Sequence, residues 1–102
     1  MSALTEEEFS KYEKAIQADL WKFRKEFYHG EESEEYWEKL YAECNRISKK
    51  HRSLYVDNML IVCIEDIEAR YNESKGRPVD ELEHFEHIVN VIRKGRQYDH
   101  NS

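Results

Sequence analysis

Residues that end helices are scarce in this sequence. Only one proline and three glycines occur among its 102 residues, whereas Glu, Lys, Leu and Ile are abundant. Such a composition favours a few long helices over many short strands. We therefore expect an all-α fold, a small antiparallel bundle of about four helices.

The first helix is predicted over residues 6–29. Thr5 followed three residues later by Glu8 is a capping box, which is typical of a helix start. Behind it, apolar residues recur at steps of three and four, namely Phe9, Tyr12, Ile16, Leu20, Phe23 and Phe27. Gly30 offers the left-handed conformation that commonly ends a helix.

The stretch HGEESEEYWE, residues 29–38, is interpreted as the start of a second helix. Ser33 is a suitable cap, and Glu34 and Glu35 follow in the first turn, where the helix dipole favours negative charge. The expected buried stripe of this helix contains Trp37, Leu40, Cys44, Ile47 and His51.

A break near Arg52 and Ser53 is expected to separate this helix from a third one over residues 54–74. At about 100° per residue, the apolar stripes of the two segments lie about 150° apart, so one continuous rod would bury nearly opposite faces. Because the third helix is apolar nearly all round, we expect it to be central. Its stripe contains Val56, Leu60, Cys63, Ile64, Ile67 and Tyr71.

The fourth helix is predicted to begin at a second capping box, Asp80 with Glu83, and to stop at Gly95. Its apolar stripe contains Leu82, Phe85, Ile88, Val89 and Ile92. We therefore expect one helical domain over residues 1–95 and a flexible polar tail over 96–102.

Charge and composition favour some classes of function over others. The net charge of −6 disfavours direct nucleic-acid binding, and the longest apolar run, residues 59–64, is too short to span a membrane. We expect a cytoplasmic protein. Cys44 and Cys63 lack a CxxC spacing and lie among apolar neighbours, which is typical of reduced core thiols.

Two acidic patterns suggest one catalytic alternative. Residues 34–38 have the form EExxE, and residues 65–68 have the form ExxE. Carboxylates on facing helices can hold Mg²⁺. In these patterns the chain resembles the all-α nucleotide pyrophosphohydrolases of the MazG type, although Glu68 stands where that family has Asp. The resemblance covers only these short patterns, and it implies a Mg²⁺-dependent hydrolase.

The most informative feature is a second face on the first helix. Trp21 and Tyr28 project more than about 110° from the centre of its apolar stripe, and Arg24 and Lys25 border them. Trp, Tyr and Arg are over-represented in binding hot spots. We therefore expect a non-enzymatic adaptor, regulator or inhibitor that uses these four residues to bind a protein partner or a second copy of itself. We expect no catalytic residue, cofactor or metal ligand.

A different inhibitor forms the second hypothesis. The acidic rows at residues 31–38 and 65–68 could imitate nucleic-acid phosphates and occupy the basic groove of a nucleic-acid-binding protein, such as a host-defence or restriction factor. In that case Glu34, Glu35 and Glu38 would bind the partner.

Overall fold

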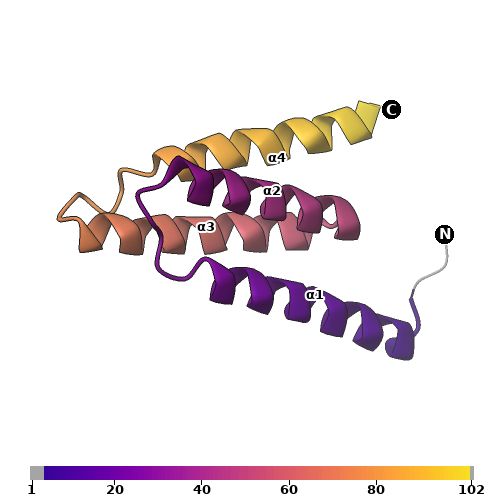
Figure 1. The fold of residues 1–102 in the computed structure, drawn as a ribbon. Helices are drawn as coiled ribbons and strands as arrows, with labels where there is room; N and C mark the ends of the chain where they lie inside the picture. Colours follow the sequence, from indigo (N-terminus) through magenta and orange to yellow (C-terminus); the bar gives the residue numbers. More distant parts are fainter. Residues whose placement is uncertain (1–3, 102) are drawn as a thin grey trace.

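The fold is all-α, as predicted. A computed structural model describes residues 4–101, and side chains within 4–94. It contains α1 (Glu6–Glu26), α2 (Glu34–His51), α3 (Leu54–Ser74) and α4 (Glu83–Asn101), with no strand among the described residues. Consecutive helices run in opposite directions, so α1 and α3 run parallel to each other (Figure 1).

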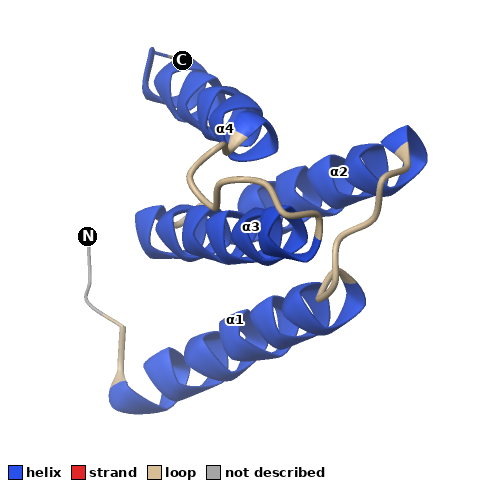
Figure 2. Ribbon diagram, turned by 90° about the vertical axis from the view of Figure 1, so that its left-hand side faces the viewer, coloured by secondary structure: helices blue, strands red, loops and turns tan. Residues whose placement is uncertain are grey.

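The helices α2 and α3 form the middle of the bundle, with α1 and α4 on opposite sides of them (Figure 2). The central position expected for α3 is confirmed, because α3 contacts each of the other three helices. The whole predicted stripe of α3 is buried. The rest of the core comes mainly from Ile16, Leu20, Phe23, Phe27, Trp37, Leu40, Cys44, Ile47, Ile88, Val89 and Ile92.

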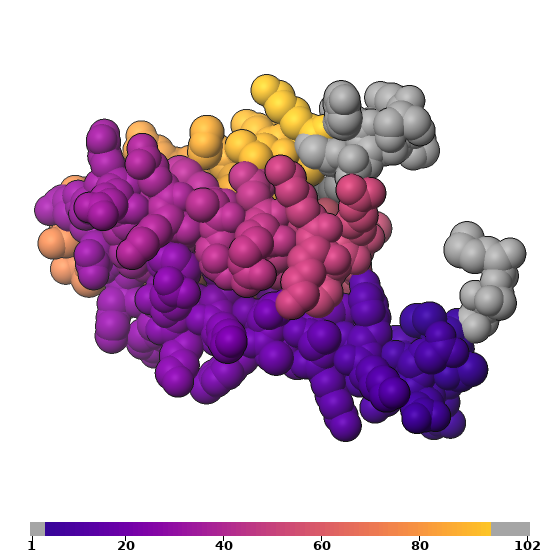
Figure 3. All heavy atoms as spheres, turned by 45° about the vertical axis from the view of Figure 1, so that its right-hand side comes forward, coloured from indigo at the N-terminus to yellow at the C-terminus, as the bar shows by residue number. Residues whose placement is uncertain are grey.

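The helix α1 begins as predicted, since the Thr5 hydroxyl accepts a hydrogen bond from the backbone N–H of Glu8 at 3.1 Å. Phe9 was expected in the core, but 52 % of it is exposed. The N-terminal end of α1 extends past the neighbouring end of α2 (Figure 3). The first turn therefore has little of the bundle to pack against.

The predicted end of α1 at residue 29 is wrong, because the helix ends at Glu26. The Tyr36 hydroxyl donates to the Phe27 carbonyl at 2.9 Å and accepts from the Gly30 N–H at 3.0 Å. This side chain from α2 thus fixes the loop after α1. Gly30 does have a positive φ of 71°, but a Cβ there would also lie 2.8 Å from the Cβ of Tyr71. A close backbone approach to α3 therefore requires glycine at this position.

The junctions around α2 agree with the sequence analysis. The Ser33 hydroxyl accepts from the Tyr36 N–H at 3.3 Å and caps α2, with Glu34 and Glu35 in the first turn. Arg52 has the left-handed conformation that ends α2, and the Ser53 hydroxyl caps α3. The two helices are therefore separate, and each buries its own stripe.

Both predicted ends of α4 are wrong. The helix begins at Glu83, three residues after Asp80, so Asp80 is not its cap. The backbone N–H groups of His84 and Phe85 instead donate to the carboxylate of Glu68 on α3, at 3.0 and 2.7 Å.

At the other end, α4 continues through Gly95 to Asn101. A glycine within a helix costs only about 1 kcal/mol relative to alanine, so it does not by itself end a helix. The boundary of the domain at residue 95 and the flexibility of 96–102 stay predictions, and Ser102 lies outside the described residues.

Candidate functional site

A groove of about 240 Å³ runs between α1 and α3. Its lining combines apolar side chains with one ion pair. We call it the α1–α3 groove, and its lining residues are Gln17, Leu20, Trp21, Arg24, Met59, Val62, Cys63 and Asp66.

The apolar part of this groove is unusually exposed. The side chain of Trp21 is 65 % exposed and that of Val62 is 57 % exposed. Among the described side chains, large exposed apolar residues lie on α1 and α3 or directly beside α1, with Val79 in the α3–α4 loop as the exception. The full set is Leu4, Phe9, Trp21, Tyr28, Leu54, Tyr55, Val62 and Val79. The described parts of α2 and α4 contribute none.

Charged groups occupy the end of the groove that lies toward the C-termini of α1 and α3. The same carboxylate oxygen of Asp66 lies 3.6 Å from Nη2 of Arg24 and 2.6 Å from Nη2 of Arg70. The guanidinium of Arg70 also lies 4.0 Å from the centroid of the Tyr28 ring, which is a cation–π contact. Tyr28 is therefore joined to the charged end of the groove through Arg70.

The residues predicted on the second face of α1 are only partly brought together. Trp21 and Arg24 both line the groove, and Tyr28 lies next to it through Arg70. Lys25 is exposed but does not line the groove. The sequence analysis missed Met59, Val62 and Asp66 on α3. Their i, i+3 and i+7 spacing continues from Tyr55 along one face of the helix and is the signal that could have revealed them.

A larger groove of about 830 Å³ lies between α2, the α3–α4 loop and the start of α4. Eight carboxylate side chains line it against the single guanidinium of Arg77, so we call it the acidic groove. The acids are Glu32, Glu34, Glu38, Glu68, Asp80, Glu81, Glu83 and Glu86. The predicted partner residues Glu34 and Glu38 are among them, whereas Glu35 is not.

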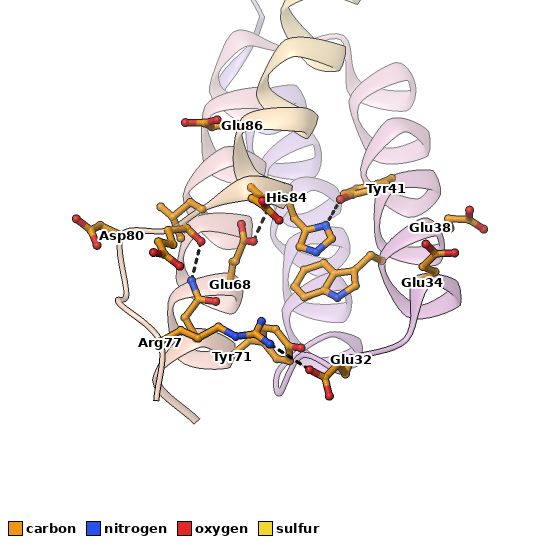
Figure 4. A pocket seen from close by; sticks show the side chains of 15 residues that line it. Glu32, Glu34, Glu38, Tyr41, Glu68, Tyr71, Arg77, Asp80, His84 and Glu86 are labelled. Atoms are coloured by element: carbon orange, nitrogen blue, oxygen red, sulfur yellow. Dashed lines mark hydrogen bonds and ion pairs between the residues drawn. The ribbon is translucent and has the colours of Figure 1, made fainter. Parts of the chain in front are cut away.

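Most of these acids are exposed, but Glu68 is buried, with 2 % of its surface accessible. Figure 4 shows its carboxylate beneath the start of α4, with the hydrogen bond from the His84 N–H. The Phe85 N–H donates to its other oxygen. Glu68 therefore serves the helix junction. It is not part of an exposed acidic row, and the row predicted at residues 65–68 loses this member.

An aromatic wall closes one side of the acidic groove. The rings of Trp37 and His84 stack with centroids 3.9 Å apart, and the Tyr41 hydroxyl contacts Nδ1 of His84. Burial lowers the pKa of His84, although Glu68 and Glu83 act in the opposite direction. Burial, with Glu68 and Glu83 adding to it, raises the pKa of Tyr41 to about 12. A neutral His84 whose Nδ1 accepts a hydrogen bond from the protonated Tyr41 hydroxyl is consistent with both shifts.

The carboxylates are not arranged as a metal site. Of the five acids that the Mg²⁺ hypothesis needs, Glu34, Glu38 and Glu68 line the acidic groove, but Glu35 and Glu65 do not. Within the described part of the chain, no group of three or more His, Cys, Asp or Glu side chains is placed to hold a metal ion.

A partly buried ionic cluster ties α1 to the end of α2. Asp19 on α1 accepts from Nε2 of His51 at 2.7 Å and from Nζ of Lys50 at 2.9 Å. Burial alone would raise the pKa of Asp19, but these two partners outweigh it and hold the pKa below its usual value. Burial raises the pKa of Cys44 and of Cys63, so both thiols are protonated and unreactive at neutral pH.

No protein-family model, curated protein or solved structure matches the chain. None of the described helices combines the length and the apolar character that crossing a membrane requires.

Proposed function

We propose that this protein is a non-enzymatic binding domain that contacts a protein partner through the α1–α3 groove. The observation that carries the proposal is the exposure of Trp21 and Val62 on facing sides of one groove. Exposed apolar side chains that cluster, rather than scatter singly, are typical of interaction sites. Trp and Arg, both present here, are over-represented in binding hot spots.

The position of the groove in the fold also supports binding. The helices α1 and α3 are joined below the groove by the buried core, which includes Leu20, Phe23 and Cys63. Two packed helices with an apolar groove on their outer side suit an amphipathic helix, whose apolar side chains would fill the α1–α3 groove.

The test is capture of the partner with matched variants. Val62→Glu places a charge in the α1–α3 groove, and Val79→Glu places the same charge outside it. The two valines are a matched pair because they are similarly exposed, at 57 % and 52 %. We expect Val62→Glu and Trp21→Ala to abolish co-purification of the partner and Val79→Glu to preserve it. All three variants should unfold within a few degrees of the wild type, because substitutions of exposed side chains change stability by about 0.5 kcal/mol or less.

Two results would contradict the proposal. A partner retained equally by all variants would show that binding occurs elsewhere. A large loss of thermal stability in Trp21→Ala would show that Trp21 stabilises the fold and is not available to a partner.

The acidic groove supports a second candidate function, an acidic inhibitor that occupies the basic groove of a nucleic-acid-binding protein. Seven carboxylates line this groove when the buried Glu68 is set aside, against the one guanidinium of Arg77. In this case binding should weaken steeply as salt is raised, and DNA or RNA should compete with the domain. Binding that is insensitive to salt and to competing nucleic acid would exclude this candidate.

A further inference from the structure

The charges in the α1–α3 groove point to the chemistry of its occupant. We propose that the groove binds an acidic amphipathic helix, with one bulky apolar side chain between Trp21 and Val62 and one carboxylate on Arg24. This inference rests on the proposed function and specifies the class of partner.

The first argument is local charge. Two guanidinium groups, from Arg24 and Arg70, share the single carboxylate of Asp66. With Arg70 just outside the lining counted, this end of the groove has two guanidinium groups for one carboxylate. It is therefore locally positive, although the whole chain carries a net charge of −6. An acidic partner segment would be repelled by most of this protein and attracted here, which favours one binding position over others.

The second argument is that Arg24 can take a new partner. Its Nη2 lies 3.6 Å from Asp66, beyond good hydrogen-bond distance, and its side chain is 49 % exposed. The guanidinium of Arg70 makes the shorter contact at 2.6 Å and is held against the Tyr28 ring. Asp66 is therefore committed mainly to Arg70. A carboxylate from the partner could pair with Arg24 through two parallel N–H donors, the strongest geometry for such a pair.

The third argument is spacing. Trp21 and Arg24 lie one turn apart on α1, and Val62 and Asp66 lie one turn apart on α3. Because α1 and α3 run parallel (Figure 1), the apolar half of the groove is followed by the charged half on both helices. A helix that lies along the groove in either direction matches this arrangement with an apolar residue and an Asp or Glu three or four positions apart.

A second copy of this chain fits the groove less well. In a two-fold symmetric dimer centred on the groove, the same surface faces itself. With the two-fold axis along the groove, the Arg24 side chains of the two copies would approach each other, and like charges across an interface are unfavourable. With the axis across the groove, the charged end of each copy would face the apolar end of the other and gain no opposite charge. Charge complementarity therefore favours a different, acidic chain.

The experiment uses a random library of displayed peptides of about 15 residues, long enough to form a helix on binding. The intact domain is the bait, and the affinities of selected peptides are measured by fluorescence anisotropy. We expect selected peptides to share an apolar residue and an Asp or Glu that lies three or four positions away on either side of it. Val62→Glu should remove their binding.

A matched pair of variants tests the charge. Arg24→Glu should weaken the selected peptides about tenfold or more, which corresponds to about 1.4 kcal/mol. Arg46→Glu should leave their affinity unchanged, because Arg46 on α2 is 52 % exposed and also pairs with one carboxylate, but lies outside the groove. Exchanging the peptide's acid for Lys should restore binding to Arg24→Glu.

The possible failures are distinguishable. Peptides that need Val62 but are insensitive to Arg24→Glu, or that are rich in Lys and Arg, would overturn the acidic partner and leave the proposed function intact. A selection in which no binder depends on Val62 would overturn both. Analytical sedimentation of the domain alone measures its oligomeric state. A dimer that dissociates in the Val62→Glu variant would show that a second copy occupies the groove, and this would overturn the inference.

Discussion

The junction between α3 and α4 allows one stability prediction to be worked out from the structure. Glu68→Ala removes the carboxylate that accepts the N–H groups of His84 and Phe85. Hydrogen bonds to charged acceptors contribute about 1.5–3 kcal/mol each, and a carboxylate at a helix N-terminus adds about 0.3–1 kcal/mol. Burying the carboxylate offsets part of this sum.

We therefore expect Glu68→Ala to lower the free energy of unfolding by about 3 kcal/mol, a large part of the about 5–15 kcal/mol typical of a domain. Glu68→Gln keeps one acceptor oxygen and should lose about half as much. The control is Glu65→Ala, which changes an exposed Glu on the same helix and should stay within about 0.5 kcal/mol of the wild type.

Urea denaturation followed by circular dichroism gives these free energies. Amide hydrogen exchange adds a local readout, because the first turn of α4 should lose protection before the rest of α4. The reasoning would be refuted by a Glu68→Ala variant as stable as Glu65→Ala, with unchanged exchange at His84 and Phe85.

Three further predictions concern other features. Ser33→Ala should lower the free energy of unfolding by about 1 kcal/mol through the lost cap of α2, measured by the same denaturation, and an unchanged midpoint would contradict this role. Because the pKa of folded His84 lies below its unfolded value of 6.5, its contribution to stability is complete above pH 6.5 and is lost as the pH falls through the folded pKa. Urea midpoints between about pH 7.5 and 5 should therefore fall less in His84→Gln than in the wild type, and equal slopes would count against a neutral, partly buried His84. Millimolar Mg²⁺ should leave the melting temperature unchanged in both the wild type and Glu38→Gln, whereas a stabilisation that disappears in Glu38→Gln would favour the hydrolase hypothesis.

The elements were largely predictable because their signals are local. Ser33 and the acids after it mark the start of α2, and the opposed stripes of α2 and α3 require the break at Arg52. In each case neighbouring residues decide the conformation. The apolar spacing also identified most of the core.

The wrongly predicted helix ends lie where a residue distant in the sequence determines the local conformation. The cap of α4 comes from Glu68 on α3, and Tyr36 on α2 fixes the loop after α1. No local pattern contains such contacts. Periodicity placed Phe9 on the apolar stripe correctly, but it could not show that the bundle ends before reaching this residue.

Only the α1 side of the α1–α3 groove could be predicted from the sequence. The angular position of Trp21 and Tyr28 on one helix follows from the sequence, and both side chains are exposed. The other half comes from Val62 and Asp66, which join the groove only because α1 and α3 pack side by side. The pairing of Arg24 with Asp66 likewise depends on the register of these two helices.

The most direct test of the α1–α3 groove as the partner-binding site is site-specific photo-crosslinking in cells. A photoreactive phenylalanine analogue replaces Val62 in one variant and Val79 in the other, two exposed valines on different parts of the surface. We predict one discrete crosslinked product for the Val62 position and none for the Val79 position. Crosslinking at Val79 alone, or equally at both positions, would contradict the account.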